Sequence, residues 1–225
     1  MRWSALAGLG LLSVVAAACS ATESHHAIDT ESVSSHYDAY SGPKVPLAIG
    51  VFENRSPYMS GMFSDGVNRL GGQARTILTT HLSQSGRFAL MDRDNMTETA
   101  KEAEYSGTTQ QIGGATYIVS GQVTEFGRRE TGDQQLFGIG GHAKTQTAYS
   151  KVSLNIVDVK SSQVVYSVQG AGECDLSDRE ILGFGSTSSY DATLNGKVLN
   201  LSIMQAVEKL VADMKSGTFP PASHP

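Results

Sequence analysis

A short apolar segment that ends at Cys19 determines which part of this chain is left to fold. Arg2 supplies one positive charge, an apolar stretch follows, and three alanines stand directly before the cysteine. The stretch is too short to span a bilayer readily as a helix. Its layout is typical of a bacterial secretory signal of the lipoprotein type. We expect cleavage after residue 18, lipidation of Cys19 and export to a membrane surface.

Two details around Cys19 bear on this expectation. An ordinary signal peptide cut after Ala18 or nearby is the alternative reading of the same segment. Ser20 follows the cysteine instead of Asp, so nothing there argues for retention in the inner membrane. We therefore expect a protein anchored in the outer membrane with its core in the periplasm. The lipid on Cys19 is the only attached group expected, with no other cofactor.

The composition narrows the classes of function. The chain has 17 basic and 22 acidic residues, and no cluster of Lys and Arg offers a footprint for phosphates, so a nucleic-acid partner is not expected. Cys174 is the only cysteine besides Cys19. No disulfide framework is therefore available, and we expect the Cys174 thiol to have no functional role.

Polar segments flank the region that is expected to fold. Residues 19–44 have no apolar period and are predicted to be a flexible, lipid-anchored tether. His25, His26 and His36 match no standard metal-site spacing, so a solvated linker is the better interpretation. Residues 216–225 hold three of the six prolines and are predicted to form a frayed tail.

Apolar periodicity predicts an α/β (α+β) core with a mixed sheet over residues 45–215. Short apolar runs indicate strands, and three- and four-residue spacing indicates helices. The expected strands are 45–52, 88–91, 115–123, 152–159 and 164–168. The expected helices are one from Ser64 or Asp65 to Gly86, then 94–105, a short one at 108–113, and 196–215.

Two long stretches do not belong to this core and are predicted to be β-hairpin insertions, residues 125–151 and 169–193. In the first, a turn is expected at Phe137, Gly138, Ile139, Gly140 and Gly141. Its two flanks, residues 128–137 and 142–151, each have the length of a tilted membrane-spanning strand, about 9 to 11 residues.

The alternation in both insertions is weak. In the first, Thr147 and Tyr149 fall on the less polar side of the second flank. In the second, Tyr190 and Ala192 share a parity after a bend. The alternative is that both are solvated or extended loops. If they do cross a membrane, four strands cannot close a barrel and open edges cannot face lipid, so several copies must form a ring.

The order of three sequence stretches resembles the CsgG family of curli production assembly/transport lipoproteins, which includes holdfast-anchoring relatives. The first stretch runs from Pro57 to Ser64, the second combines residues 137–140 with Val152–Val159, and the third is Leu201–Glu208. With the lipid cysteine, the likeness extends over nearly all of residues 45–214. No single motif is specific; their order and spacing carry the resemblance.

This resemblance implies a ring-shaped secretion channel whose subunits each give two hairpins to an oligomeric transmembrane β-barrel. It also implies a pore constriction formed by Tyr58, Met62 and Phe63, with Met62 departing from the family's Asn. Weak, repeated contacts of this kind would let an unfolded chain slide through. The alternative is that Tyr58 and Phe63 fasten the loop onto the following helix as core residues. The implied partners are further copies of the chain, outer-membrane lipid, an unfolded secreted substrate and an accessory gating or assembly protein.

Rival functions are a lipoprotein module that activates peptidoglycan synthesis or scaffolds an envelope complex, and an accessory lipoprotein for envelope stress or motility. The long insertions favour the channel over both. An enzyme is not expected, because no nucleophile elbow, phosphate loop or dinucleotide motif is present. His81 is predicted to be a core or subunit-contact histidine. The cluster at Asp175, Asp178, Arg179 and Glu180 is predicted to be a solvated hairpin end.

Overall fold

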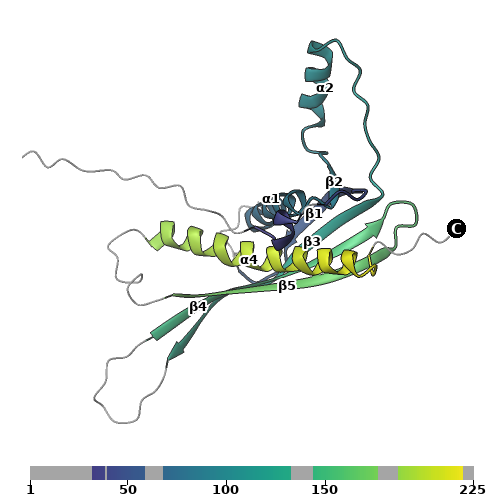
Figure 1. The fold of residues 1–225 in the computed structure, drawn as a ribbon. Coiled ribbons are helices and arrows are strands. Elements are labelled where there is room, and N and C mark those ends of the chain that lie inside the picture. The colour runs from purple at the N-terminus through teal and green to yellow at the C-terminus, as the bar shows by residue number, and fades with distance from the viewer. Residues whose placement is uncertain (1–31, 39, 59–67, 133–143, 177–186, 220–225) are drawn as a thin grey trace, which may run out of the picture. The chain divides into compact units, whose positions relative to one another are not determined.

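A five-stranded mixed sheet organises the fold in the spatial order β2-β1-β3-β4-β5 (Figure 1). β1 runs parallel to β2 and β3, whereas β4 is antiparallel to both of its neighbours. The structure, a computed structural model, describes residues 32–38, 40–58, 68–132, 144–176 and 187–219. The strands are β1 Val45–Asn54, β2 Phe88–Met91, β3 Tyr117–Gly132, β4 Lys144–Asp158 and β5 Val164–Leu176. The mixed sheet that the sequence predicts is therefore confirmed.

Two helices, α1 Arg69–Gln84 and α4 Thr187–Lys215, cover the same face of this sheet and pack against each other. The buried side chains of α1 recur at the spacing of one helical face, as the sequence predicts. On the opposite face of the sheet no described helix is packed, and Val51 and Ile118 are exposed. The core lies between that sheet and the two helices, and its largest fully buried members include Leu47, Leu78, Leu82, Leu154, Ile156, Leu199, Ile203 and Leu210.

Two of the local predictions between the strands are wrong. α1 begins at Arg69 instead of Ser64 or Asp65, because the Asn68 side chain accepts a hydrogen bond from the Gly71 N–H and caps the helix there. Helix α2, Met96–Tyr105, is present as expected, but residues 108–113 form no helix. Gly107 has a φ of +67° directly after α2, so the chain leaves the helical direction there.

The second predicted hairpin is only half present. β5 continues to Leu176 as a strand paired with β4, which extends it well beyond the expected end at residue 168. Tyr190 and Ala192, however, lie in α4 and not in a returning strand. Tyr190 and Leu194 stand eight and four positions before Val198, respectively, so this segment continues the helical period of α4.

The polar segment before β1 is docked on the core from residue 32 onward. This strap (residues 32–38 and 40–44) contains a short 3-10 helix, Ser34–Tyr37, and its Val33 is completely buried in the hydrophobic core. The Ser34 N–H also donates to Glu208 of α4 at 3.2 Å. The prediction of a flexible tether up to residue 44 is therefore wrong for the strap, and the compact unit begins at Ser32.

Charged contacts hold the other end of the strap. The Arg87 guanidinium lies 3.9 Å from the centre of the Tyr40 ring and 3.6 Å from a carboxylate oxygen of Asp38. Lys215 pairs with the same carboxylate at 2.7 Å. The strap thus joins the start of β2 to the end of α4.

The segment after α4 differs from its prediction in a similar way. Phe219 is completely buried, and its ring lies 5.4 Å from that of Tyr117 and 5.3 Å from that of Tyr166. The predicted frayed tail is therefore wrong as far as Phe219. Among the described residues, no helix combines the length and apolar character needed to cross a bilayer.

Candidate functional site: a pinned loop at the root of a strand ribbon

The loop after β1 is held at its start by the side chain of Asn54. The Asn54 Oδ1 accepts hydrogen bonds from the Ser56 N–H at 3.0 Å and from the Ser56 hydroxyl at 2.6 Å. Its Nδ2 donates to the Tyr58 carbonyl at 2.8 Å. An asparagine at the end of a strand can bond its own backbone a few residues on, which shapes a turn. Asn54 therefore fixes the path of the chain as far as Tyr58.

Asn68 fixes the other end of the loop to the same strand. Its Oδ1 accepts from the Asn54 N–H at 3.2 Å and from the Gly71 N–H at 3.0 Å, and its Nδ2 donates to the Phe52 carbonyl at 2.8 Å. One side chain thus caps α1 and ties it to the carboxyl end of β1. Both ends of the loop are held, whatever path lies between them.

Tyr58 lies against the strand that becomes the first insertion. Its ring is half-buried and lies 4.7 Å from that of Phe126 on β3, at an interplanar angle of 54°. The Arg55 N–H donates to the Val123 carbonyl at 2.9 Å, which brings the start of the loop to the same level of β3. Met62 and Phe63 lie outside the described residues, so Tyr58 alone of the predicted constriction is placed.

The first insertion continues the core sheet as a paired hairpin. β3 and β4 stay in register from Phe126 opposite Ser150 to Gly132 opposite Lys144, and β5 accompanies β4 as far as Leu176 opposite Gln146. We call this three-stranded extension the ribbon; it comprises Phe126–Gly132, Lys144–Ser150 and Gly172–Leu176. The predicted turn at Phe137, Gly138, Ile139, Gly140 and Gly141 lies outside the described residues, as does Cys19.

One face of the ribbon carries charges that pair across the strands. Arg129 is paired with Glu173 and lies 5.5 Å from the centre of the Tyr149 ring, and the Thr147 hydroxyl donates to Asp175 at 2.7 Å. Thr147 and Tyr149 therefore lie on the face that carries the Arg129–Glu173 ion pair. The other face carries Ala148, which is buried, with Arg128 and Cys174 directly opposite it on the neighbouring strands.

Both outer edges of the ribbon lack a strand partner among the described residues. β1 ends at Asn54 opposite Val123, so β3 has no neighbour on that side from Glu125 onward. β5 is the last strand of the sheet, so its far edge has none either. Unpaired edges of this kind are ready to add a strand from another chain.

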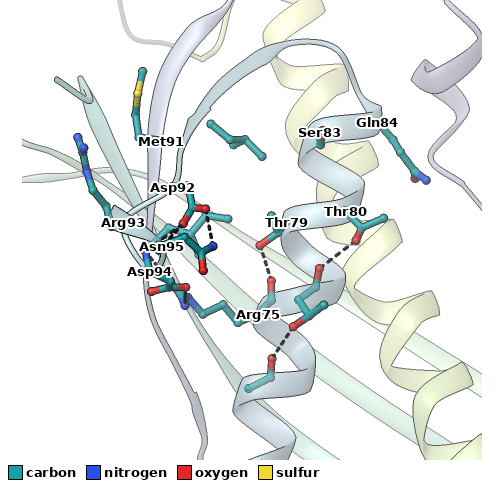
Figure 2. A pocket seen from close by; sticks show the side chains of 14 residues that line it. Arg75, Thr79, Thr80, Ser83, Gln84, Met91, Asp92, Arg93, Asp94 and Asn95 are labelled. Carbon is teal, nitrogen blue, oxygen red and sulfur yellow. Dashed lines mark hydrogen bonds and ion pairs between the residues drawn. The ribbon is translucent and has the colours of Figure 1, made fainter. Parts of the chain in front are cut away.

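A concave region that the sequence does not indicate lies between α1 and the end of β2 (Figure 2). Its volume is about 620 Å³, and Arg75 there is paired with Asp94. A hydrogen bond from the Asn95 side chain, followed by backbone N–H groups, lowers the pKa of Asp92 in the same region. The hydroxyls of three threonines in this region, Thr76, Thr79 and Thr80, donate to backbone carbonyls one helical turn earlier.

The remaining candidate residues have structural partners. The Nε2 of buried His81 lies 2.8 Å from Asn200 Oδ1, which joins α1 to α4 as the core interpretation predicts. Cys174 is a half-buried free thiol. Within the described part of the chain, no group of three His, Cys, Asp or Glu side chains could hold a metal ion. Asp178, Arg179 and Glu180 lie outside it.

Comparison with known proteins adds a family and several relatives. The family model described as "Curli production assembly/transport component CsgG" matches residues 32–220. A Neisseria meningitidis serogroup B protein whose name describes a lipoprotein is 53% identical over 201 residues, which is 89% of this chain and 90% of the relative. The family that the sequence resembles is thereby confirmed.

Two solved structures share a low similarity with this chain. The PelC dodecamer from Paraburkholderia phytofirmans is 17% identical, with a TM-score of 0.35 over 75% of this chain and 93% of that one. The LpoB C-terminal domain from Salmonella enterica is 12% identical, with a TM-score of 0.31 over 58% and 85%.

Proposed function

Because the chain belongs to the CsgG family of curli production assembly/transport components, we propose that it is one subunit of a ring-shaped outer-membrane channel. In this proposal Cys19 carries the lipid anchor and the core lies in the periplasm. The cargo is an unfolded fibre or adhesin subunit, and an accessory protein gates or assembles the ring. The lipoprotein name of the Neisseria relative agrees with the anchor.

The ribbon is the observation that carries the proposal. It continues the core sheet without a break, and among the described residues β3 and β5 have no strand partner on their outer edges there. Such edges cannot face lipid alone, because each unpaired backbone group there costs several kcal/mol. Placing β3 of one copy beside the β5 side of the next would pair both edges, and repetition of that head-to-tail contact would close a ring.

The Tyr58 loop supports the same reading. It stands at the root of the ribbon, where a ring of copies would narrow, and both of its ends are held by Asn54 and Asn68. A held loop can present the same side chains in every copy. In the proposal Tyr58, Met62 and Phe63 form the constriction, through which an unfolded chain slides by weak contacts.

The second candidate is a lipid-anchored module that activates peptidoglycan synthesis or scaffolds an envelope complex without forming a pore. The helical state of Tyr190 and Ala192 favours it, because these two residues then belong to no returning strand. Negative-stain imaging of the lipidated protein in detergent separates the two. Rings with a central hole are expected for the channel. A population of single subunits at every concentration would favour the module.

A further inference from the structure

β5 is the outermost strand of the sheet, yet part of its outer edge is already occupied. Gln169 lies opposite Ser153 and Ala171 lies opposite Lys151. In an antiparallel pair the hydrogen-bonding direction alternates along the strand, so residues two apart direct their backbone groups to the same side. The Gln169 carbonyl and the Ala171 N–H bond side chains of α4, so the backbone groups of these two residues are directed away from β4.

Two side chains of α4 bind these outward groups. The Ala171 N–H donates to the Gln205 Oε1 at 2.8 Å, and the Lys209 Nζ donates to the Gln169 carbonyl at 2.8 Å. Gln205 and Lys209 are four positions apart, so they lie on the same side of the helix, one turn from each other. No acidic side chain is bonded to the Lys209 Nζ in the described part of the chain, and the ammonium group serves the strand edge.

Glycines on β5 let the helix come close enough for this. A Cβ at Gly172 would lie 2.7 Å from the Val198 carbonyl oxygen, and a Cβ at Gly170 would collide with the backbone of α4 at Ser202. The Ser202 hydroxyl also donates to the Ser150 hydroxyl at 3.1 Å, beneath the same crossing. The close crossing and the two capping side chains thus form one arrangement.

We propose that Gln205 and Lys209 cap the core part of the β5 edge, so that a second copy of this chain can add only to the ribbon. A complete antiparallel pair uses both the N–H and the carbonyl of one residue. With one of these groups engaged in Gln169 and one in Ala171, neither residue can form that pair. One turn of α4 therefore removes two successive docking positions from the edge.

The ribbon part of the same strand is different. In the described structure no side chain of α4 is bonded to the backbone of Glu173, while its carboxylate is occupied by Arg129 on the sheet face. The surface that accepts the next copy is then the edge from Glu173 to Leu176, and its counterpart is the outer edge of β3 from Phe126 to Gly132, which no described strand pairs with. Blocking part of an edge with a charged side chain is a known protection against unwanted strand addition. The biological role of this cap rests on the proposed ring, whereas the experiments that test the cap do not require the ring.

The first test measures the cap itself, by hydrogen exchange of the Ala171 amide in full-length lipidated protein held in detergent. Gln205→Leu removes the acceptor, and we expect exchange at Ala171 to become at least about tenfold faster. Gln205→Glu keeps an oxygen acceptor at the same position and should preserve slow exchange. Equal exchange in wild type and Gln205→Leu would overturn the cap.

The second test measures what the cap prevents. In a Gln205→Leu/Lys209→Met double variant, we expect native mass spectrometry to detect assemblies larger than those of wild type, growing with concentration. Gln205→Glu/Lys209→Arg is the matched control and should keep the wild-type sizes. Wild-type sizes in the first double variant would overturn the proposal. If that variant fails to fold, Lys209→Met alone replaces it with the same two outcomes.

The two proposals fail separately. If wild type forms no ring, the channel proposal fails, and exchange at Ala171 still decides whether the cap exists. If rings form and the double variant is unchanged, the channel stands and the cap has no role in assembly.

Discussion

Asn54 and Asn68 are joined to each other at the carboxyl end of β1, where the Asn54 N–H donates to the Asn68 Oδ1 at 3.2 Å. The two residues stand at opposite ends of one loop. Through this contact the last residue of a strand and the cap of the following helix become a single clamp. The position of Tyr58 depends on that clamp, since the Asn54 Nδ2 holds the Tyr58 carbonyl.

Replacing Asn68 with alanine should destabilise the protein and loosen the loop. The change removes the α1 cap, worth about 1 kcal/mol, and two further hydrogen bonds of about 0.5–1.5 kcal/mol each. We expect a loss of about 2–4 kcal/mol in urea unfolding. Asn95→Ala is the control, because Asn95 precedes α2 without a side-chain cap bond. Equal losses in both variants would contradict the clamp.

Replacing Tyr58 with alanine should widen the channel at a modest cost in stability. Its ring contact with Phe126 is worth about 0.5–1.5 kcal/mol beyond burial. If Tyr58 lines the constriction, single-channel conductance in planar bilayers should rise. Tyr105→Ala is the control, because Tyr105 is exposed on α2. An unchanged conductance for Tyr58→Ala would leave Tyr58 as a packing residue only.

Two glycine substitutions should act in opposite directions. Gly170→Ala places a methyl group against the backbone of α4, and overpacking of this kind typically costs about 1–3 kcal/mol. Gly72→Ala adds a methyl group on an exposed turn of α1 where no atom lies within 4 Å. Gains in helix propensity there are up to about 1 kcal/mol. Thermal unfolding that finds both variants destabilised alike would argue against the close crossing of α4 over β5.

The strap should detach in acid. The hydrogen bond from Lys215, and then its charge, lowers the pKa of Asp38 below its ordinary value of 3.8. A carboxyl group with a lowered folded pKa stabilises the folded state above its ordinary pKa, and that contribution is lost as the pH falls through the folded pKa. Hydrogen exchange at Val33–His36, corrected for intrinsic pH dependence, should therefore accelerate below about pH 4.

Asp38→Asn supplies the control for this pH dependence. The variant lacks the ion pair at every pH, so exchange in the strap should already be faster at pH 7 and should change less in acid. A wild-type acceleration that persists unchanged in Asp38→Asn would assign it to other carboxyl groups.

Much of the sheet follows from local pattern, because short apolar runs and helical spacing are readable residue by residue. β2 was predicted with the bounds it has, and β1 within two residues of its end at Asn54. The continuation of β5 to Leu176 was not expected as part of the core sheet. The alternation of apolar and polar side chains is weak in this part of β5, because Gly170 and Gly172 have no side chains to contribute to it.

Contacts between distant parts of the chain escaped prediction for a different reason. Val33 and Phe219 are single apolar residues in polar segments, so no period marks them, yet both are completely buried. The Gln205–Ala171 bond joins a side chain to a backbone group 34 positions away. Only the crossing of α4 over β5 brings such groups together, and that crossing is a property of the whole fold.

The most direct test of the proposed channel is the conductance of the purified, lipidated protein in planar bilayers. The account predicts discrete, reproducible current steps from wild type, with larger steps from Tyr58→Ala and steps of wild-type size from Tyr105→Ala. The absence of steps from protein that mass spectrometry confirms to carry its lipid would contradict the channel.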